Sequence, residues 1–193
     1  MNLRITIFFG QFIIFFVIED ENNVLEVNHF CTGTLISNKV VITAEHCLLE
    51  KELTNVRVIV GSIDVRLGKR YRIFHWLSYN QWLKVLTSKD EFEKHDVAVL
   101  QLTEEVPNNI QPVPISNLKS FEIFGSNVIS SGWGSSNTFI LPILMETVAL
   151  KIIPNNQCEL VIKKVQRKRI PIPERILCSS SMPPAIVTYK IQL

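Results

Sequence analysis

Two neighbouring stretches, Cys31-Thr-Gly-Thr-Leu-Ile-Ser37 and Val41-Ile-Thr-Ala-Glu-His-Cys47, decide how this sequence folds. The second begins with β-branched residues, which favour a strand, and it ends on a histidine directly followed by a cysteine. A disulfide at Cys47 would fix the backbone that directs the His46 imidazole, and a general base needs that rigidity. The simpler interpretation is a histidine that only makes a hydrogen bond where it lies. No comparable motif surrounds the other three histidines, His29, His75 and His95.

An even set of four cysteines points to disulfides, and its members are Cys31, Cys47, Cys158 and Cys178. Pairing each cysteine with its neighbour in the sequence closes two short loops, and each closure contributes about 3 kcal/mol when the geometry is relaxed. Four cysteines allow three connectivities, so the local pairing is preferred rather than deduced. A zinc site is the competing interpretation because histidines flank two of the cysteines, but neither a Cys-x2-Cys nor a His-x3-His spacing is present. Disulfides require an oxidising compartment, which favours a secreted protein.

The composition is that of a folded, nearly neutral chain. Its 193 residues include 20 Lys and Arg against 18 Asp and Glu, and 47% are hydrophobic, which suits a single packed domain or a small domain in two halves. This charge gives no reason to expect a nucleic-acid partner. The basic cluster within 163–169 lacks interleaved aromatic residues, so a solvated face is favoured over a polyanion-binding patch. None of the seven glycines follows Gly134, which excludes a later glycine-rich turn in this sequence.

Short β segments fill the middle of the chain, rich in β-branched residues and bounded by Gly, Asn, Pro or Ser. The clearest cover residues 40–43, 56–60, 97–102, 127–130 and 147–153. Their spacing favours an all-β barrel or sandwich over βαβ units. One helix is expected over 158–168, with Leu160, Val161 and Val165 facing inward. The tail is expected to begin as a loop from Ser179.

The order of these motifs resembles the trypsin/chymotrypsin family of serine proteases. In that family Cys-x-Gly-(Ser/Thr)-Leu-Ile precedes Thr-Ala-x-His-Cys, as residues 31–36 and 43–47 do here. His95-Asp-Val-Ala-Val-Leu-Gln-Leu102 is similar to the stretch whose Asp orients the catalytic His. Later segments of the family are matched by Pro112-Val-Pro-Ile115, Ser131-Gly-Trp-Gly134, Cys158 and Ile176-Leu-Cys178. The resemblance implies an all-β fold of two six-stranded antiparallel β-barrels, with the second barrel incomplete here.

The chemistry that the resemblance implies is nucleophilic acyl transfer on a polypeptide, with no cofactor and no metal. His46 takes the role of general base, and Asp96 the role of the acid that orients it. The nucleophilic serine is absent, because the family carries it in Gly-Asp-Ser-Gly-Gly-Pro and no glycine follows Gly134. The serines at 179–181 lack the glycine-built turn that points backbone amides into an oxyanion hole, so they are not replacements. Glu45 stands where the family usually has Ala or Gly, and it is expected to face solvent.

The boundaries at the N-terminus allow two interpretations. One basic residue followed by an apolar run suits a signal peptide over residues 1–18, and the run is short for a membrane span, so a membrane partner is not expected. Alternatively residues 12–18 form a buried strand, a leader remnant covers only 1–9, and the protease-like domain runs over 10–193. We expect a secreted chain shortened at both ends and inactive as it stands. The alternative is a non-catalytic protease homologue that serves as a secreted binding module for a protein partner.

Overall fold

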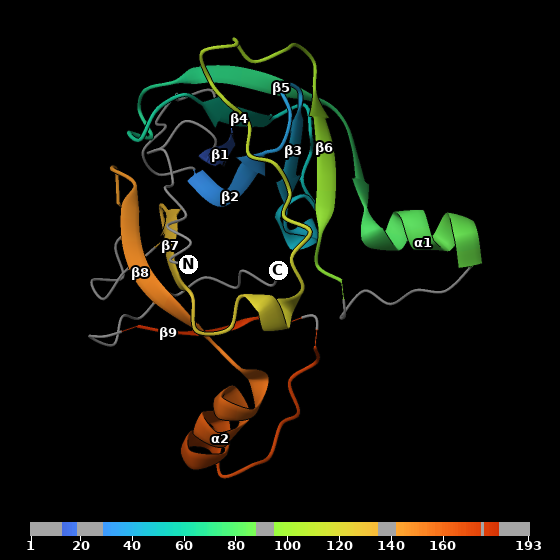
Figure 1. The fold of residues 1–193 in the computed structure, drawn as a ribbon. Helices are drawn as coiled ribbons and strands as arrows, with labels where there is room; N and C mark the ends of the chain where they lie inside the picture. Colours follow the sequence, from blue (N-terminus) through green and yellow to red (C-terminus); the bar gives the residue numbers. More distant parts are fainter. Residues whose placement is uncertain (1–12, 19–28, 88–94, 135–141, 175, 182–193) are drawn as a thin grey trace.

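A closed antiparallel barrel forms the larger part of the molecule. The computed structural model describes residues 13–18, 29–87, 95–134, 142–174 and 176–181. The barrel strands follow the order β1-β2-β3-β6-β5-β4, so the first strand closes onto the fourth (Figure 1). They are β1 (Ile13–Ile18), β2 (His29–Leu35), β3 (Val40–Thr43), β4 (Val56–Val60), β5 (Lys69–Ser78) and β6 (Ala98–Leu102). This barrel confirms the predicted six-stranded first half of the fold.

Strand β1 is buried on both faces, which explains its unbroken run of apolar residues. Alternate residues of a strand point to opposite faces. Ile14 and Phe16 point into the barrel and belong to its main core. Phe15 and Val17 point the other way and pack, with Trp133, in a second buried cluster. Residues 13–18 therefore form a buried strand, as one of the two interpretations of this stretch predicts. Residues 1–12 lie outside the described residues, so the leader boundaries stay predictions.

The second half of the chain contributes an open sheet of three strands in the order β7-β8-β9, beneath the barrel in Figure 1. Its strands are β7 (Asn127–Gly132), β8 (Glu146–Ile153) and β9 (Cys178–Ser180). In the described part of the chain this sheet does not close, as expected for an incomplete second barrel. Ser179 and Ser180 pair with β8, so the prediction of a loop from Ser179 is wrong. The cause is that β9 adds to an already formed edge, which its own sequence does not reveal.

Four short helices connect the strands in the described ranges. They are the 3-10 helices η1 (Glu45–Cys47) and η3 (Ser120–Glu122) and the α-helices α1 (Tyr79–Thr87) and α2 (Asn155–Gln166). None of the described helices has the length and apolar run needed to span a bilayer. The helix expected over 158–168 is present as α2, although it starts earlier in the sequence.

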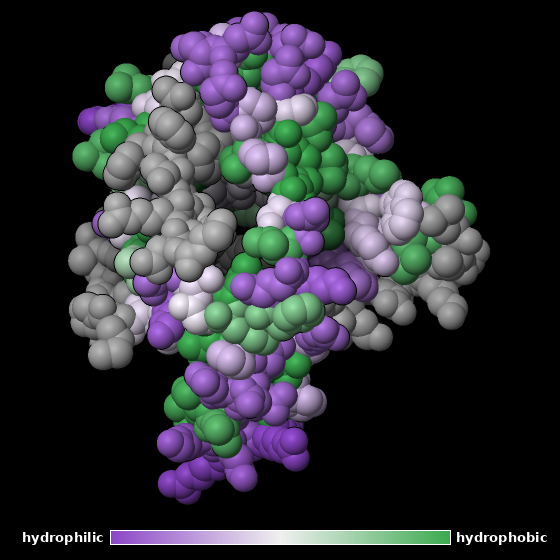
Figure 2. All heavy atoms as spheres, viewed as in Figure 1, coloured by the Kyte–Doolittle hydropathy of each residue, from purple (hydrophilic) through white to green (hydrophobic). Residues whose placement is uncertain are grey.

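The inward orientation predicted for the apolar residues of α2 is wrong. Leu160, Val161 and Val165 are 59%, 56% and 76% exposed. In Figure 2 green hydrophobic atoms lie beside purple hydrophilic ones on the part of the molecule that α2 forms, at the bottom of the view. No described element packs on this side of the helix, so its apolar residues have nothing to bury against. The basic residues within 163–169 are all exposed, as in a solvated face.

The predicted strands agree closely with observed ones in both the barrel and the open sheet. The strands at 40–43 and 56–60 have the predicted bounds, and β6, β7 and β8 differ by one or two residues. Two barrel-side elements, β5 and α1, were not predicted. Strand β5 alternates basic with apolar residues only from Arg70 to Ile73, and the run that follows leaves Phe74 70% exposed, so the period of two typical of a strand covers only the first part of it.

Candidate active site

The pairing of β3 with β6 brings His46 and Asp96 together. These strands are antiparallel, and Thr43 at the end of β3 lies opposite Ala98 at the start of β6. The chain continues from β3 into η1, which carries His46, while Asp96 lies just before β6. Both residues therefore lie just beyond the last pair of this ladder, at the same end of the barrel, although they are 50 positions apart in the sequence. The two side chains that the sequence selected are neighbours in space.

Asp96 holds His46 at two points, and we call this pair the dyad. The backbone N–H of His46 donates to Asp96 Oδ1 at 2.8 Å, and the ring Nδ1 lies 2.6 Å from Asp96 Oδ2. Because a carboxylate accepts hydrogen bonds, the proton of the neutral ring belongs on Nδ1. Nε2, which lies 3.7 Å from Cys47 Sγ, then carries the lone pair that can accept a proton. The Asp96 side chain is 14% exposed and the His46 side chain 44% exposed, so the imidazole is open to solvent and its partner is not.

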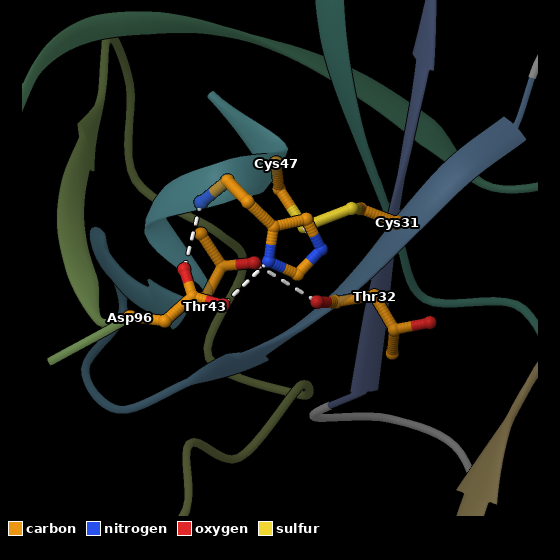
Figure 3. The surroundings of a disulfide bond; sticks show 6 residues. Cys31, Thr32, Thr43, Cys47 and Asp96 are labelled. Atoms are coloured by element: carbon orange, nitrogen blue, oxygen red, sulfur yellow. Dashed lines mark hydrogen bonds and ion pairs between the residues drawn. A yellow bond between two sulfur atoms is a disulfide. The ribbon is translucent and has the colours of Figure 1, made fainter. Parts of the chain in front are cut away.

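A disulfide fixes the short helix that carries His46. Cys31 in β2 and Cys47 in η1 are bonded, with their Cα atoms 6.0 Å apart. The hydroxyl of Thr43 donates to the Thr32 carbonyl at 3.0 Å and joins β3 to β2 beside this disulfide (Figure 3). The second disulfide, Cys158–Cys178, joins α2 to β9. Both disulfides of the preferred local pairing are formed.

The first disulfide engages the two cysteines that a zinc site would need as ligands. Among the described residues the only clustered group of potential metal donors consists of Cys31, His46 and Cys47. Zinc binds cysteine as the thiolate. Both sulfur atoms are engaged in the S–S bond, so the group offers a single imidazole. These residues do not fit a zinc ion.

Glu45 is buried, contrary to the prediction that it faces solvent. Its side chain is 3% exposed, and its Oε2 accepts a hydrogen bond of 2.8 Å from Asn80 Nδ2. Asn80 lies in α1, which no sequence pattern predicted. Neither residue carried a recognisable motif. The one feature in the sequence that pointed to Glu45 was an acid beside His46 where the family usually has a small residue. The position of α1, which brings Asn80 to Glu45, explains why this acid can be buried.

The remaining three histidines, His29, His75 and His95, are described by other contacts. His29 is 5% exposed, and its Nε2 lies 3.2 Å from the Trp133 carbonyl oxygen, to which a ring N–H donates. His95 lies beside Asp96, with its ring centroid 4.1 Å from that of Tyr79. His75 is exposed on β5. None of the three was predicted as a site residue.

These features define the class of trypsin-like folds. They are a closed six-stranded barrel, a histidine held by a disulfide at one end of the barrel, and a partial second sheet. The family model described as Trypsin matches residues 10–183. The chain belongs to this family of trypsin-like serine proteases.

Curated relatives agree with this assignment. Trypsin theta of Drosophila erecta is 30% identical over 134 residues, which cover 68% of this chain and 49% of that protein. Anionic trypsin of Canis lupus familiaris is 28% identical over 138 residues, which cover 68% of this chain and 51% of that protein. The chain thus spans about half the length of these relatives.

Solved structures show the same fold at lower identity. Neuropsin, a serine protease expressed in the limbic system of mouse brain, matches with a TM-score of 0.64 and 20% identity, over 89% of this chain and 70% of that one. The VesB protease of Vibrio cholerae matches with a TM-score of 0.67 and 17% identity, over 95% of this chain and 55% of that one. At these identities the likeness concerns the fold alone.

Proposed function

We propose that His46 and Asp96 are the general base and its orienting acid in a serine endopeptidase site that acts on polypeptides. The double hydrogen bond between them carries this proposal. It holds the ring in the tautomer with the proton on Nδ1 and leaves Nε2 as the acceptor. A general base of a serine nucleophile needs this arrangement.

In that reaction a serine oxygen bonds to the peptide carbonyl carbon while its proton passes to Nε2. Asp96 stabilises the imidazolium that forms, and the same proton then goes to the leaving amine as the C–N bond breaks. Each backbone N–H around the serine stabilises the oxyanion by roughly 3 kcal/mol. The 193 residues contain no Gly-Asp-Ser-Gly-Gly-Pro stretch, and no glycine follows Gly134. We propose that these residues alone do not form an acyl-enzyme.

A fluorophosphonate probe tests the second half of the proposal. The purified chain with both disulfides formed is expected to remain unlabelled, while anionic trypsin is labelled in parallel as the positive control. Casein is expected to stay intact. Labelling of the chain that is lost in a His46→Ala variant would show that a serine in this sequence is activated, and the proposal would be overturned.

We also propose that the protein is secreted, because of the state of its cysteines. All four are engaged in disulfides, which persist in oxidising compartments. Expression in the reducing cytosol is expected to yield free thiols and a less stable chain than expression in an oxidising compartment. Thiol quantification after denaturation measures this difference, and equal stability of the reduced and oxidised chains would contradict it.

A further inference from the structure

Glu45 is a buried carboxylate placed directly before the proposed base. Its side chain is 3% exposed, and that of Asn80, its hydrogen-bond partner in α1, is 7% exposed. Burying a carboxylate costs several kcal/mol unless hydrogen bonds compensate for the lost water. The 2.8 Å bond from Asn80 Nδ2 therefore joins η1 firmly to α1.

The same end of α1 is also joined to the segment that carries the proposed acid. The backbone N–H of Tyr79 donates to the Val97 carbonyl at 3.0 Å. The Tyr79 ring lies 4.1 Å from the His95 ring, centroid to centroid. These two contacts lie on either side of Asp96. Adjacent residues of α1 thus contact the neighbour of the base and both neighbours of the acid.

The barrel ladder does not reach the dyad by itself. The paired residues of β3 and β6 end at Thr43 and Ala98. Beyond that point the β3–β6 ladder no longer joins η1 to the segment before β6. Besides the bonds of the dyad, the contacts through α1 connect these two segments.

We propose that Glu45 and Asn80 are positioning residues, which hold η1 against α1 so that the His46 ring stays directed at Asp96. This inference rests on the proposed function, and neither residue touches the reacting atoms. The orientation of the Asn80 amide follows from Glu45, because Nδ2 donates to the carboxylate while Oδ1 is buried and has no partner among the described residues. The bond is the polar contact that fixes this side chain.

The test reads the dyad directly in the full 193-residue oxidised chain. In the wild type, proton NMR is expected to show a downfield Nδ1–H resonance of His46, and the nitrogen shifts to show an unprotonated Nε2. Glu45→Ala removes the carboxylate, and Asn80→Ala leaves it without its donor. Both variants are expected to lose the downfield resonance. The indole N–H of Trp133, which donates to the Ile63 carbonyl at 3.0 Å, reports whether the fold is kept.

A conservative variant separates geometry from charge. In Glu45→Gln the side-chain oxygen still accepts from Asn80 Nδ2, and the new amide donates to the unpartnered Oδ1. This variant is expected to keep the resonance. Glu52→Ala removes an exposed acid near η1 and serves as the matched control, with no expected change.

Two results would overturn the inference. One is a His46 resonance that persists in Glu45→Ala or in the double variant Glu45→Ala/Asn80→Ala, the version that leaves no buried group unpaired. The other is its loss in Glu45→Gln with the Trp133 signal intact. A wild-type chain that lacks the resonance altogether would instead contradict the proposed dyad itself.

Discussion

Asp96 acts on His46 through both carboxylate oxygens, one bonded to the backbone N–H and the other to the ring. This division determines what the aspartate does. The backbone bond fixes which oxygen faces η1, so the second oxygen faces Nδ1. Asp96 therefore acts on the orientation of the His46 ring and is more than a nearby charge.

Replacing Asp96 by Asn is expected to invert the tautomer of His46. The amide oxygen keeps the bond from the His46 N–H, so the NH2 group faces Nδ1 and donates to it. The ring proton then moves to Nε2, and the lone pair of the proposed base is lost. Nitrogen shifts of the His46 ring measure the tautomer. Asp64→Asn, which alters a carboxylate bonded to Arg66, is the control, and an unprotonated Nε2 in Asp96→Asn would contradict the prediction.

At the scale of the element, the connection between β4 and β5 combines a glycine turn with an ion pair. Gly68 has a φ of +101°, and a Cβ there would lie 2.8 Å from Ile59 Cγ2 and 2.9 Å from the Val60 carbonyl oxygen. Gly125 has a φ of +82° with nothing near its Cβ position. The two turns share the backbone requirement for glycine and differ in the space available.

Gly68→Ala is therefore expected to destabilise the protein more than Gly125→Ala. A left-handed conformation costs an alanine about 1–2 kcal/mol, and overpacking against backbone adds about 1–3 kcal/mol at Gly68 only. Urea unfolding of the two variants measures the difference. Equal losses of unfolding free energy would show that the contact at Gly68 relaxes without cost.

Arg66 makes the Asp64 side chain a stronger acid than an ordinary aspartate. Its side chain donates to both carboxylate oxygens, and its backbone N–H to one of them, which lowers the pKa of Asp64 to about 2. An unfolded aspartate has a pKa of about 3.9. The folded value is the lower one, so this contribution to stability is present above about pH 4 and is lost as the pH falls towards 2.

Arg66→Ala is expected to reduce the free energy of unfolding at pH 7. The difference from the wild type is expected to shrink between pH 4 and pH 2, because the folded Asp64 takes up a proton as the pH falls towards its pKa of about 2. Denaturant unfolding at several pH values measures it. A difference that stays constant down to pH 2 would contradict the assigned role of the pair.

At the scale of the whole molecule, Trp133 joins the second half of the chain to the barrel. It is 1% exposed, its ring centroid lies 4.7 Å from that of Phe15 in β1, and its Nε1 donates to the Ile63 carbonyl. Its own carbonyl accepts from His29. Backbone bonds from Val65 to the Ile143 carbonyl and from Met145 to the Ile63 carbonyl continue the contact. The partial sheet is thus held against the outer face of β1.

Trp133→Ala is expected to cost about 3–5 kcal/mol of unfolding free energy, because a large buried side chain leaves a cavity. Trp133→Phe retains most of the packing and loses one hydrogen bond, at a cost of about 1 kcal/mol. Amide hydrogen exchange in the alanine variant is expected to accelerate more in β7 and β8 than in β4. Uniform acceleration would mean that the two halves unfold as one unit.

The sequence by itself determined the features that local pattern encodes. Runs of β-branched residues located β3, β4 and β6 almost to the residue, and the His46 and Asp96 motifs identified two side chains that the barrel brings within 2.6 Å of each other. The local disulfide pairing, which the spacing of the cysteines favoured among three connectivities, is the one formed. In each case the information lies in a few neighbouring residues.

Only the tertiary structure decided what covers each side chain. Glu45 is buried because α1, an element without a clear sequence signal, brings Asn80 to it. Leu160 and Val161 of α2 are exposed because no described element packs on them, although their pattern alone is that of a buried face. Whether a side chain is buried depends on partners distant in the sequence, and a local pattern states only which residues would benefit from one.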